Sequence, residues 1–169
     1  MKIFQPKIPK DVKILEEKPP CYDSVCQFLG YTDIQAFFTY GDTIYNPAKL
    51  KITHDIVIHE RVHMRQQKAL IIFKGVVPSG NETVQMTPEL WWGRFLRDPI
   101  FRRDQEAKAY AAQYDALCSQ TKDRTQKHKY LIGLSRTLAG PLYGNCVEVS
   151  GAILLIKSHS KQWPANINS

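Results

Sequence analysis

The chain has 169 residues, 43% of them apolar, which is enough material for one domain with a hydrophobic core, and a second domain is not expected. No apolar run approaches the length of a membrane span and the first ten residues lack the apolar segment of a signal peptide, so we expect a cytoplasmic protein with no membrane span. The net charge of +7 is spread along the chain, which indicates general solubility and predicts no nucleic-acid partner.

The N-terminal part is predicted to contain an extended arm, a short helix and a hairpin. Residues 1–20 hold four prolines among lysines, which indicates an arm that closes on the domain surface or docks on a partner rather than a regular element. Residues 21–29 can form a helix that ends at Gly30. Residues 34–47 place aromatic and β-branched residues on both sides of Gly41, a pattern that predicts a β-hairpin. Its edge strand could bind a peptide by strand addition, or its aromatic side chains could simply cover the following helix.

The most informative stretch is residues 52–67, which contains the pattern H-E-x-x-H as His59, Glu60 and His63. Residues four apart lie on one face of a helix, so the two imidazoles can bind one metal ion while Glu60 stands beside it. A zinc ion held by neutral imidazoles binds and acidifies a water molecule, and a neighbouring carboxylate can take its proton. The alternative is a surface helix on which the same three side chains are solvated.

The sequence around the motif favours a helix. Thr53 can cap its start, and no glycine or proline interrupts the run to Leu70. We expect this helix to end near Gly75 and a loop to follow as far as Met86.

Two further helices have clear start signals. Thr87 and Pro88 begin a helix that carries Trp91 and Trp92, and because adjacent side chains diverge, we expect that both cannot enter one core and that one lines a pocket or an interface. The pair Asp98-Pro99 begins a long helix at residues 99–119.

The long helix is predicted to supply the third metal ligand, because two histidines and a water leave one protein ligand missing. Glu106 is the best candidate, since the alanines around it allow another helix to approach and Tyr110 lies one turn further on the same face. His128, in a polar lysine-rich stretch, and Glu89, an acid of a helix start, are weaker candidates.

The C-terminal third is predicted to be a polar loop at residues 121–130 passing into a helix that Gly140 and Pro141 stop, and then a last short helix capped by Ser150. The domain is expected to span residues 21–158, with a polar tail at 159–169. The four cysteines are too few for a disulfide scaffold and lack paired spacing, so we expect free thiols.

These residues resemble the zincin metallopeptidases, and among them the gluzincins, in which a glutamate on a later helix joins the two histidines. The resemblance implies an α+β, mostly helical, zincin-like single domain with an N-terminal hairpin or small sheet, and a Zn²⁺ ion bound by His59, His63 and Glu106. Many gluzincins have an acidic residue where Tyr110 stands here. The resemblance therefore does not identify the group that orients a ligand histidine, and the candidates are Asp104, Asp115 and backbone carbonyls.

The motif with the later segments W-x-x-x-F-L-x-D-P and P-L-Y-G-N also looks like small proteins encoded by tailed bacteriophages. That resemblance implies an infection-stage enzyme or a minor virion component, located in the host cytoplasm or the virion, with other virion proteins as partners.

Two functions follow as expectations. The first is a zinc-dependent hydrolase of peptide bonds, acting on a peptide or a cell-wall peptide, with Glu60 as the general base and Tyr110 or Arg103 stabilising the oxyanion. The alternative is a structural or adaptor protein of a phage virion or tail with a closed, non-catalytic metal site, to which His54 or Cys118 would add a fourth ligand.

Overall fold

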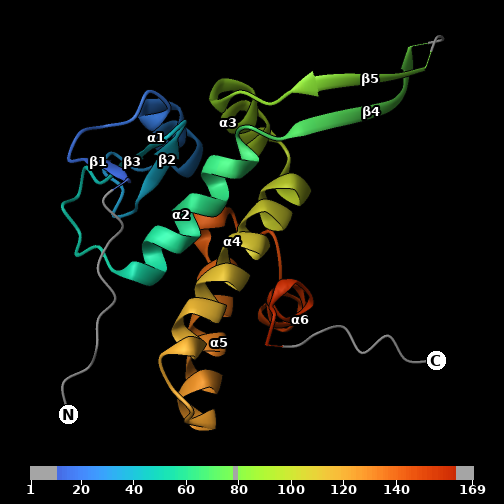
Figure 1. Ribbon diagram of the computed structural model, residues 1–169. Coiled ribbons are helices and arrows are strands. Elements are labelled where there is room, and N and C mark those ends of the chain that lie inside the picture. Colours follow the sequence, from blue (N-terminus) through green and yellow to red (C-terminus); the bar gives the residue numbers. More distant parts are fainter. Residues whose placement is uncertain (1–10, 78–79, 163–169) are drawn as a thin grey trace.

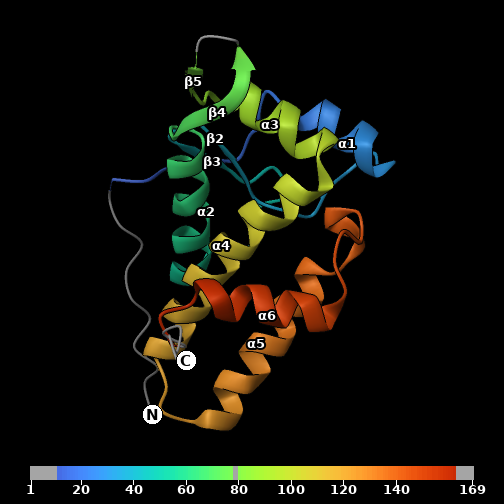
Figure 2. The same cartoon turned by 90° about the vertical axis from the view of Figure 1, so that its right-hand side faces the viewer.

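Helices build the centre of the molecule. The computed structural model describes residues 11–77 and 80–162. Figure 1 shows α2 crossing α4, and Figure 2 shows α6 lying across α4 and α5. The bounds of these helices are α2 His54–Gln66, α4 Pro99–Ser119, α5 Arg124–Leu138 and α6 Val149–His159. The chain is thus a single mostly helical α+β domain, as predicted.

Helix α4 has the predicted bounds and lies at the middle of the core. It starts where Asp98 accepts hydrogen bonds from the backbone amides of Ile100 and Phe101, and proline occupies its first position. Ala107, Ala109 and Ala111 are buried in its central turns. Because their side chains are small, α2 and α6 can pack closely on α4.

A small mixed sheet packs beside α2. Strands β2 (Phe38–Tyr40) and β3 (Thr43–Tyr45) form the predicted hairpin, and the turn between them contains Gly41 at φ +61°. Strand β1 (Lys13–Leu15) pairs in parallel with β3, so the sheet order is β1-β3-β2. The sequence predicted an arm without a regular element at 1–20. Lys13–Leu15 forms a strand there instead because β3 offers it a free edge, and residues 1–10 lie outside the described residues.

Helix α1 (Tyr22–Leu29) ends at Gly30 in the left-handed conformation, with φ +70°, as predicted. Helix α3 (Pro88–Arg97) also begins as predicted, since the Thr87 side chain accepts a hydrogen bond from the backbone amide of Leu90.

The prediction that the two tryptophans cannot share a core is wrong. Trp91 is 1% exposed and Trp92 is 9% exposed, and both belong to the main hydrophobic cluster. The hydrophobic cluster extends along two sides of α3, so the adjacent side chains of Trp91 and Trp92 can both enter it. Trp91 donates a hydrogen bond to the Gln105 side chain on α4, while Trp92 donates one to the backbone carbonyl of Thr39 on β2.

The predicted extension of the metal-motif helix to Gly75, and the loop after it, are also wrong. Helix α2 ends at Gln66, and the chain then forms an antiparallel hairpin of β4 (Leu70–Val77) and β5 (Gly80–Gln85) that projects from the helical body (Figure 1). Gln67 occupies the position after the helix, and its buried side chain accepts a hydrogen bond from the backbone amide of Gly41 and donates one to the carbonyl of Thr39. The β-branched and aromatic residues that follow suit a strand.

The C-terminal helices differ slightly from the prediction. Helix α5 begins at Arg124, inside the predicted loop, because Asp123 accepts hydrogen bonds from two amides of its first turn. Gly140 follows its end as predicted, and a single turn η1 (Pro141–Tyr143) comes next. Helix α6 begins at Val149, with Glu148 rather than Ser150 at the capping position, because the Glu148 carbonyl accepts the first helical hydrogen bond, from Ala152.

Residues 163–169 of the predicted tail lie outside the described residues. All four cysteines are free thiols, as predicted.

Candidate metal centre

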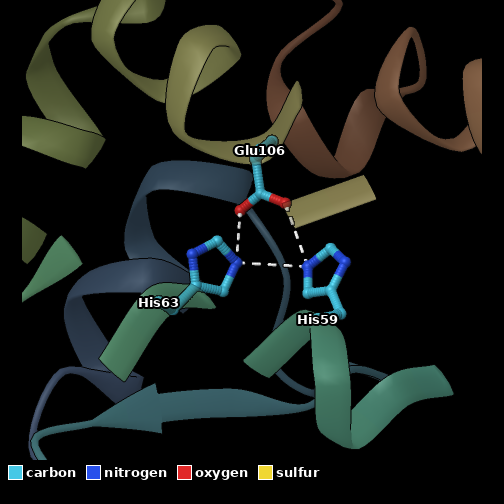
Figure 3. A group of neighbouring side chains, drawn as sticks. All are labelled: His59, His63 and Glu106. Carbon is cyan, nitrogen blue, oxygen red and sulfur yellow. Dashed lines mark hydrogen bonds and ion pairs between the residues drawn. The ribbon is translucent and has the colours of Figure 1, made fainter. Parts of the chain in front are cut away.

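Two helices bring three ligand side chains to one point. His59 and His63 come from successive turns of α2, and Glu106 comes from α4 (Figure 3). The Nε2 atoms of the histidines are 3.1 Å apart, and the Glu106 carboxylate oxygens lie 3.4 Å from His59 Nε2 and 3.3 Å from His63 Nε2. The three residues are between 3% and 6% exposed. The sequence prediction of a cluster that can hold a metal ion is thus confirmed in its geometry.

The distances between the donor groups of the three residues are close to those around a tetrahedral metal ion. Ligand atoms that are about 2.0–2.1 Å from such an ion lie about 3.3–3.4 Å from one another. The two histidine Nε2 atoms are 3.1 Å apart, and each lies near this distance from a different oxygen of the Glu106 carboxylate, His63 Nε2 at 3.3 Å from Oε1 and His59 Nε2 at 3.4 Å from Oε2. Glu106 Oε2 is also buried and makes no hydrogen bond, its contact being His59 Nε2 at 3.4 Å, and a buried carboxylate oxygen without a hydrogen bond favours a bound cation.

Without a metal, the cluster holds its charge as an ion pair. Burial alone would lower the pKa of His63, but the negative charge and hydrogen bonding of Glu106 outweigh it and raise the pKa to about 9. Burial would in turn raise the pKa of Glu106, but the two histidines outweigh it and lower the pKa to about 2. The site is therefore built to hold positive charge, which a proton or a metal ion can supply.

Two glutamine side chains bind the outer nitrogens of the histidines. His59 Nδ1 is 3.1 Å from Gln113 Oε1, and His63 Nδ1 is 2.8 Å from Gln66 Oε1. Each amide is held from its other end, because Gln113 Nε2 donates to Asp55 and Gln66 Nε2 donates to the carbonyl of Gln105. With Nδ1 used in this way, both Nε2 atoms face the centre of the cluster.

The acidic candidates for this orienting role lie elsewhere. Asp104 pairs with Arg103, and Asp115 accepts hydrogen bonds from Ser160 and the amide of Lys161. The sequence analysis missed both glutamines, although Gln66 follows His63 by one helical turn.

Glu60 stands beside the ligands and is not one of them. It is buried, and its Oε2 accepts a 2.7 Å hydrogen bond from the Thr39 hydroxyl on β2. Because the cluster of potential ligands among the described residues comprises only His59, His63 and Glu106, the Glu60 carboxylate remains available for proton transfer.

Two adjoining cavities border the site. The inner one, of about 60 Å³, is bounded by the three ligands, Glu60 and a wall of aromatic residues that includes Trp91 and Trp92. The outer one, of about 270 Å³, shares several lining residues with it: Ala36, Phe37, His59, Glu60, Leu142 and Tyr143. The expectation that one tryptophan lines a pocket is thus met by both.

The edge of β2 is less open than expected for a peptide-binding strand. The Gln67 side chain and Trp92 Nε1 both bind the carbonyl of Thr39, and Gln67 also binds the amide of Gly41. These contacts occupy the turn end of the edge, so a bound strand could reach only the part that precedes Thr39, where residues 35–37 line the outer cavity.

Two tyrosines reach the site. The Tyr110 ring packs edge-on against His59, with ring centroids 4.6 Å apart, and its hydroxyl is 2.8 Å from the hydroxyl of Tyr143. Tyr143, at the end of η1, lines both cavities, and burial raises the pKa of both phenols. The sequence analysis did not single out Tyr143, although it lies within the P-L-Y-G-N segment. Both phenols are therefore neutral hydroxyl donors at ordinary pH.

The structure does not bring the other candidates into the site. Arg103 pairs with its neighbour Asp104 and lines neither cavity. Glu89 is exposed and bonds Tyr40, while His128 is exposed beside a separate basic pocket. Neither His54 nor Cys118 belongs to the ligand cluster of the described chain.

Comparison with known proteins finds no match: no protein-family model, no curated protein and no solved structure matches the chain. Across the two described stretches, no helix combines the length and apolar character needed to cross a membrane. The resemblance to the zincins therefore stays a prediction that depends on the motif and the geometry of the site.

Proposed function

We propose that this protein is a zinc-dependent hydrolase of peptide bonds. One observation carries the proposal: three buried ligand atoms converge at metal-binding distances, while a second glutamate lies next to them beside a cavity. Two histidines and one carboxylate leave a fourth position for water, which is the arrangement of catalytic rather than structural zinc sites.

A zinc ion bound there supplies a Lewis acid and an acidified water molecule. The chain's own residues then supply the proton transfers and the orientation. Glu60 acts as general base, and the Thr39 hydroxyl orients its carboxylate by donating a hydrogen bond to Oε2.

The tyrosine pair can donate a hydrogen bond to the oxyanion that forms on the substrate. Among the described residues, the Tyr110 hydroxyl has the Tyr143 hydroxyl as its hydrogen-bond partner. If Tyr110 donates to Tyr143, the Tyr143 proton is free to point into the cavities that Tyr143 lines. This assigns the role predicted for Tyr110 or Arg103 to Tyr143, which lines both cavities, whereas Tyr110 lines only the outer one.

The cavities favour an uncharged stretch of substrate. Apart from the two glutamates and two histidines of the site, no ionisable acid or base other than the tyrosines lines either cavity within the described residues. A peptide or a cell-wall peptide that presents small neutral side chains fits this lining. A phage origin and a cytoplasmic or virion location stay predictions from the resemblance.

The test compares wild type with Glu60→Gln and, as a matched control, Glu89→Gln, which removes an exposed acid at the start of α3. Each protein is prepared without chelator, its zinc content is measured, and hydrolysis of a mixed peptide library is followed by mass spectrometry. We expect all three to bind zinc and only Glu60→Gln to lose hydrolysis, by about 100-fold or more. Undiminished hydrolysis by Glu60→Gln would refute the assignment of the base.

A second candidate is the virion structural or adaptor protein. The β4–β5 hairpin favours it, because it projects from the helical body and Leu70 at its base is 67% exposed (Figure 1). If the protein has this role, zinc-loaded wild type hydrolyses no peptide. It also forms a stable complex with a virion protein, and deletion of the hairpin abolishes that complex.

A further inference from the structure

A series of hydrogen-bonded side chains connects the start of α2 with the middle of α4. Asp55, in the first turn of α2, accepts a 2.8 Å hydrogen bond from Nε2 of Gln113, and Oε1 of Gln113 is 3.1 Å from Nδ1 of His59. Gln113 is buried, so its amide has little access to alternative partners in water. Within the described part of the chain, the group that could bind a metal ion does not include Asp55.

The Asp55 carboxylate determines where the protons lie in the hydrogen bonds from Asp55 through Gln113 to His59. An ionised carboxylate only accepts hydrogen bonds, so the amide of Gln113 must turn its NH₂ group to Asp55 and its oxygen to His59. An amide oxygen also only accepts, so His59 Nδ1 must carry a proton. In a neutral imidazole the other nitrogen, Nε2, then has a free lone pair, and it points at the centre of the cluster.

The same logic operates at His63 with a different anchor. Gln66 Nε2 donates to the backbone carbonyl of Gln105, and Gln66 Oε1 lies 2.8 Å from His63 Nδ1. A backbone carbonyl cannot change its role, whereas the anchor for His59 is a side chain that a mutation can replace. Asp55 is therefore the point at which this arrangement can be tested.

We propose that Asp55 is a positioning residue that acts through Gln113 to keep His59 in the tautomer able to bind a metal ion through Nε2. The proposal rests on the metal site of the proposed function, but not on hydrolysis. The competing explanation is that Asp55 is only an acid near the positive end of the α2 dipole. The two explanations differ in whether the effect of Asp55 passes through Gln113.

Replacing Asp55 changes the orientation of the amide in a predictable way. In Asp55→Asn the new side chain can donate or accept, so the amide of Gln113 can adopt both orientations. In Asp55→Lys the new side chain only donates, so the amide turns over and offers its NH₂ group to His59 Nδ1. The proton of His59 then moves to Nε2, where it blocks metal binding.

The first measurement is the tautomer of His59 in the metal-free protein, from ¹H–¹⁵N correlation spectra of the ring nitrogens recorded over a range of pH. We expect the Nδ1–H tautomer in wild type and in the control Glu89→Gln, a mixture in Asp55→Asn and the Nε2–H tautomer in Asp55→Lys. An unchanged tautomer in both Asp55 variants overturns the proposal. This experiment needs neither a metal ion nor activity.

The second measurement is affinity for zinc alone, from competition with a chelator, in a double-mutant cycle. We expect Asp55→Lys to weaken binding by about tenfold or more in the wild-type background, and by clearly less when Gln113 is already leucine. The Gln113→Leu background also accounts for the charge that lysine adds. Equal weakening in both backgrounds assigns Asp55 to a purely electrostatic role and overturns the proposal.

The two measurements separate the failure of this proposal from failure of the proposed function. If wild type binds no zinc, the function fails, while the tautomer spectra still decide the role of Asp55. Circular dichroism spectra establish that each variant is folded, and Asp55→Glu, which keeps the accepting carboxylate, is expected to retain the wild-type tautomer. A mixed tautomer in a folded Asp55→Glu protein counts against the proposal.

Discussion

The hydroxyl of Thr39 on β2 donates a 2.7 Å hydrogen bond to the carboxylate of Glu60 on α2. This contact links the small sheet to the metal motif. Both residues are buried, so the hydrogen bond between them is shielded from bulk solvent. The sheet thus has a part in orienting the proposed base as well as in covering the helix.

Removing this hydroxyl should impair Glu60 and leave the metal site intact. Thr39→Val has nearly the same shape, so we expect zinc affinity to stay unchanged while hydrolysis falls by about tenfold. Stability should fall by about 1–3 kcal/mol because a buried carboxylate loses a donor. Hydrolysis rates, zinc competition and urea unfolding measure the three effects, with exposed Thr125→Val as the control. If Thr39→Val lost as much zinc affinity as hydrolytic activity, this result would contradict the assignment of Glu60 as a base that does not bind the metal.

Tyr143 should matter more to the reaction than Tyr110. Loss of one oxyanion donor typically lowers kcat by about 100-fold or more, so we expect an effect of this size for Tyr143→Phe. Tyr110→Phe should have a smaller effect, since its hydroxyl acts on Tyr143 rather than on the substrate. Steady-state kinetics with zinc-loaded proteins measure both, and the opposite order of effects would assign the donor to Tyr110.

The metal-free protein should lose stability at alkaline pH. Glu106 raises the pKa of His63 from 6.5 to about 9, so this stabilisation is fully present below pH 6.5 and is lost as the pH rises through about 9. The shift corresponds to roughly 3 kcal/mol. Urea unfolding of chelator-treated protein between about pH 6 and about pH 10 measures it. The His63→Gln variant should show a flatter pH dependence over this range, and an equally steep one would contradict the ion pair.

The side chain of Gln67 should be needed for the junction between α2 and the hairpins. It is fully buried and makes hydrogen bonds with the backbone of both Thr39 and Gly41. We expect Gln67→Leu to lower the free energy of unfolding by about 1–3 kcal/mol, since the Gly41 amide loses its partner and the Thr39 carbonyl keeps only Trp92. Thermal unfolding against the exposed Gln120→Leu control measures this change. Wild-type stability in Gln67→Leu would show that these hydrogen bonds are not needed.

Structural features that depend on residues close together in the sequence were predicted correctly. The spacing of His59 and His63 places them on one helical face whatever the tertiary structure, and the pairs Thr87-Pro88 and Asp98-Pro99 start helices through local hydrogen bonds and fixed backbone angles. Glu106 was found because the chemistry of the motif requires a third ligand. These are local or chemical constraints, and the structure has all of them.

The residues that the sequence did not predict depend on contacts across the fold. Gln113 acts on His59 from 54 positions away, and Tyr143 reaches Tyr110 from a turn after another helix. A glutamine or tyrosine is common in ordinary helices, so neither attracts notice alone. The β4–β5 hairpin was missed because a short apolar run after a helix is compatible with both a helix and a strand. The contacts of Gln67 with Thr39 and Gly41, at the end of the helix, connect residues far apart in the sequence and could not be foreseen from the local pattern.

The metal site itself is tested most directly by X-ray absorption at the zinc edge on protein prepared without chelator. We expect about one zinc ion per chain, bound by two histidine nitrogens, one carboxylate and a further light atom from solvent, and no bound zinc in His63→Ala or Glu106→Ala. A wild-type protein that takes up no zinc, or whose zinc has the same surroundings in both variants, would contradict the account.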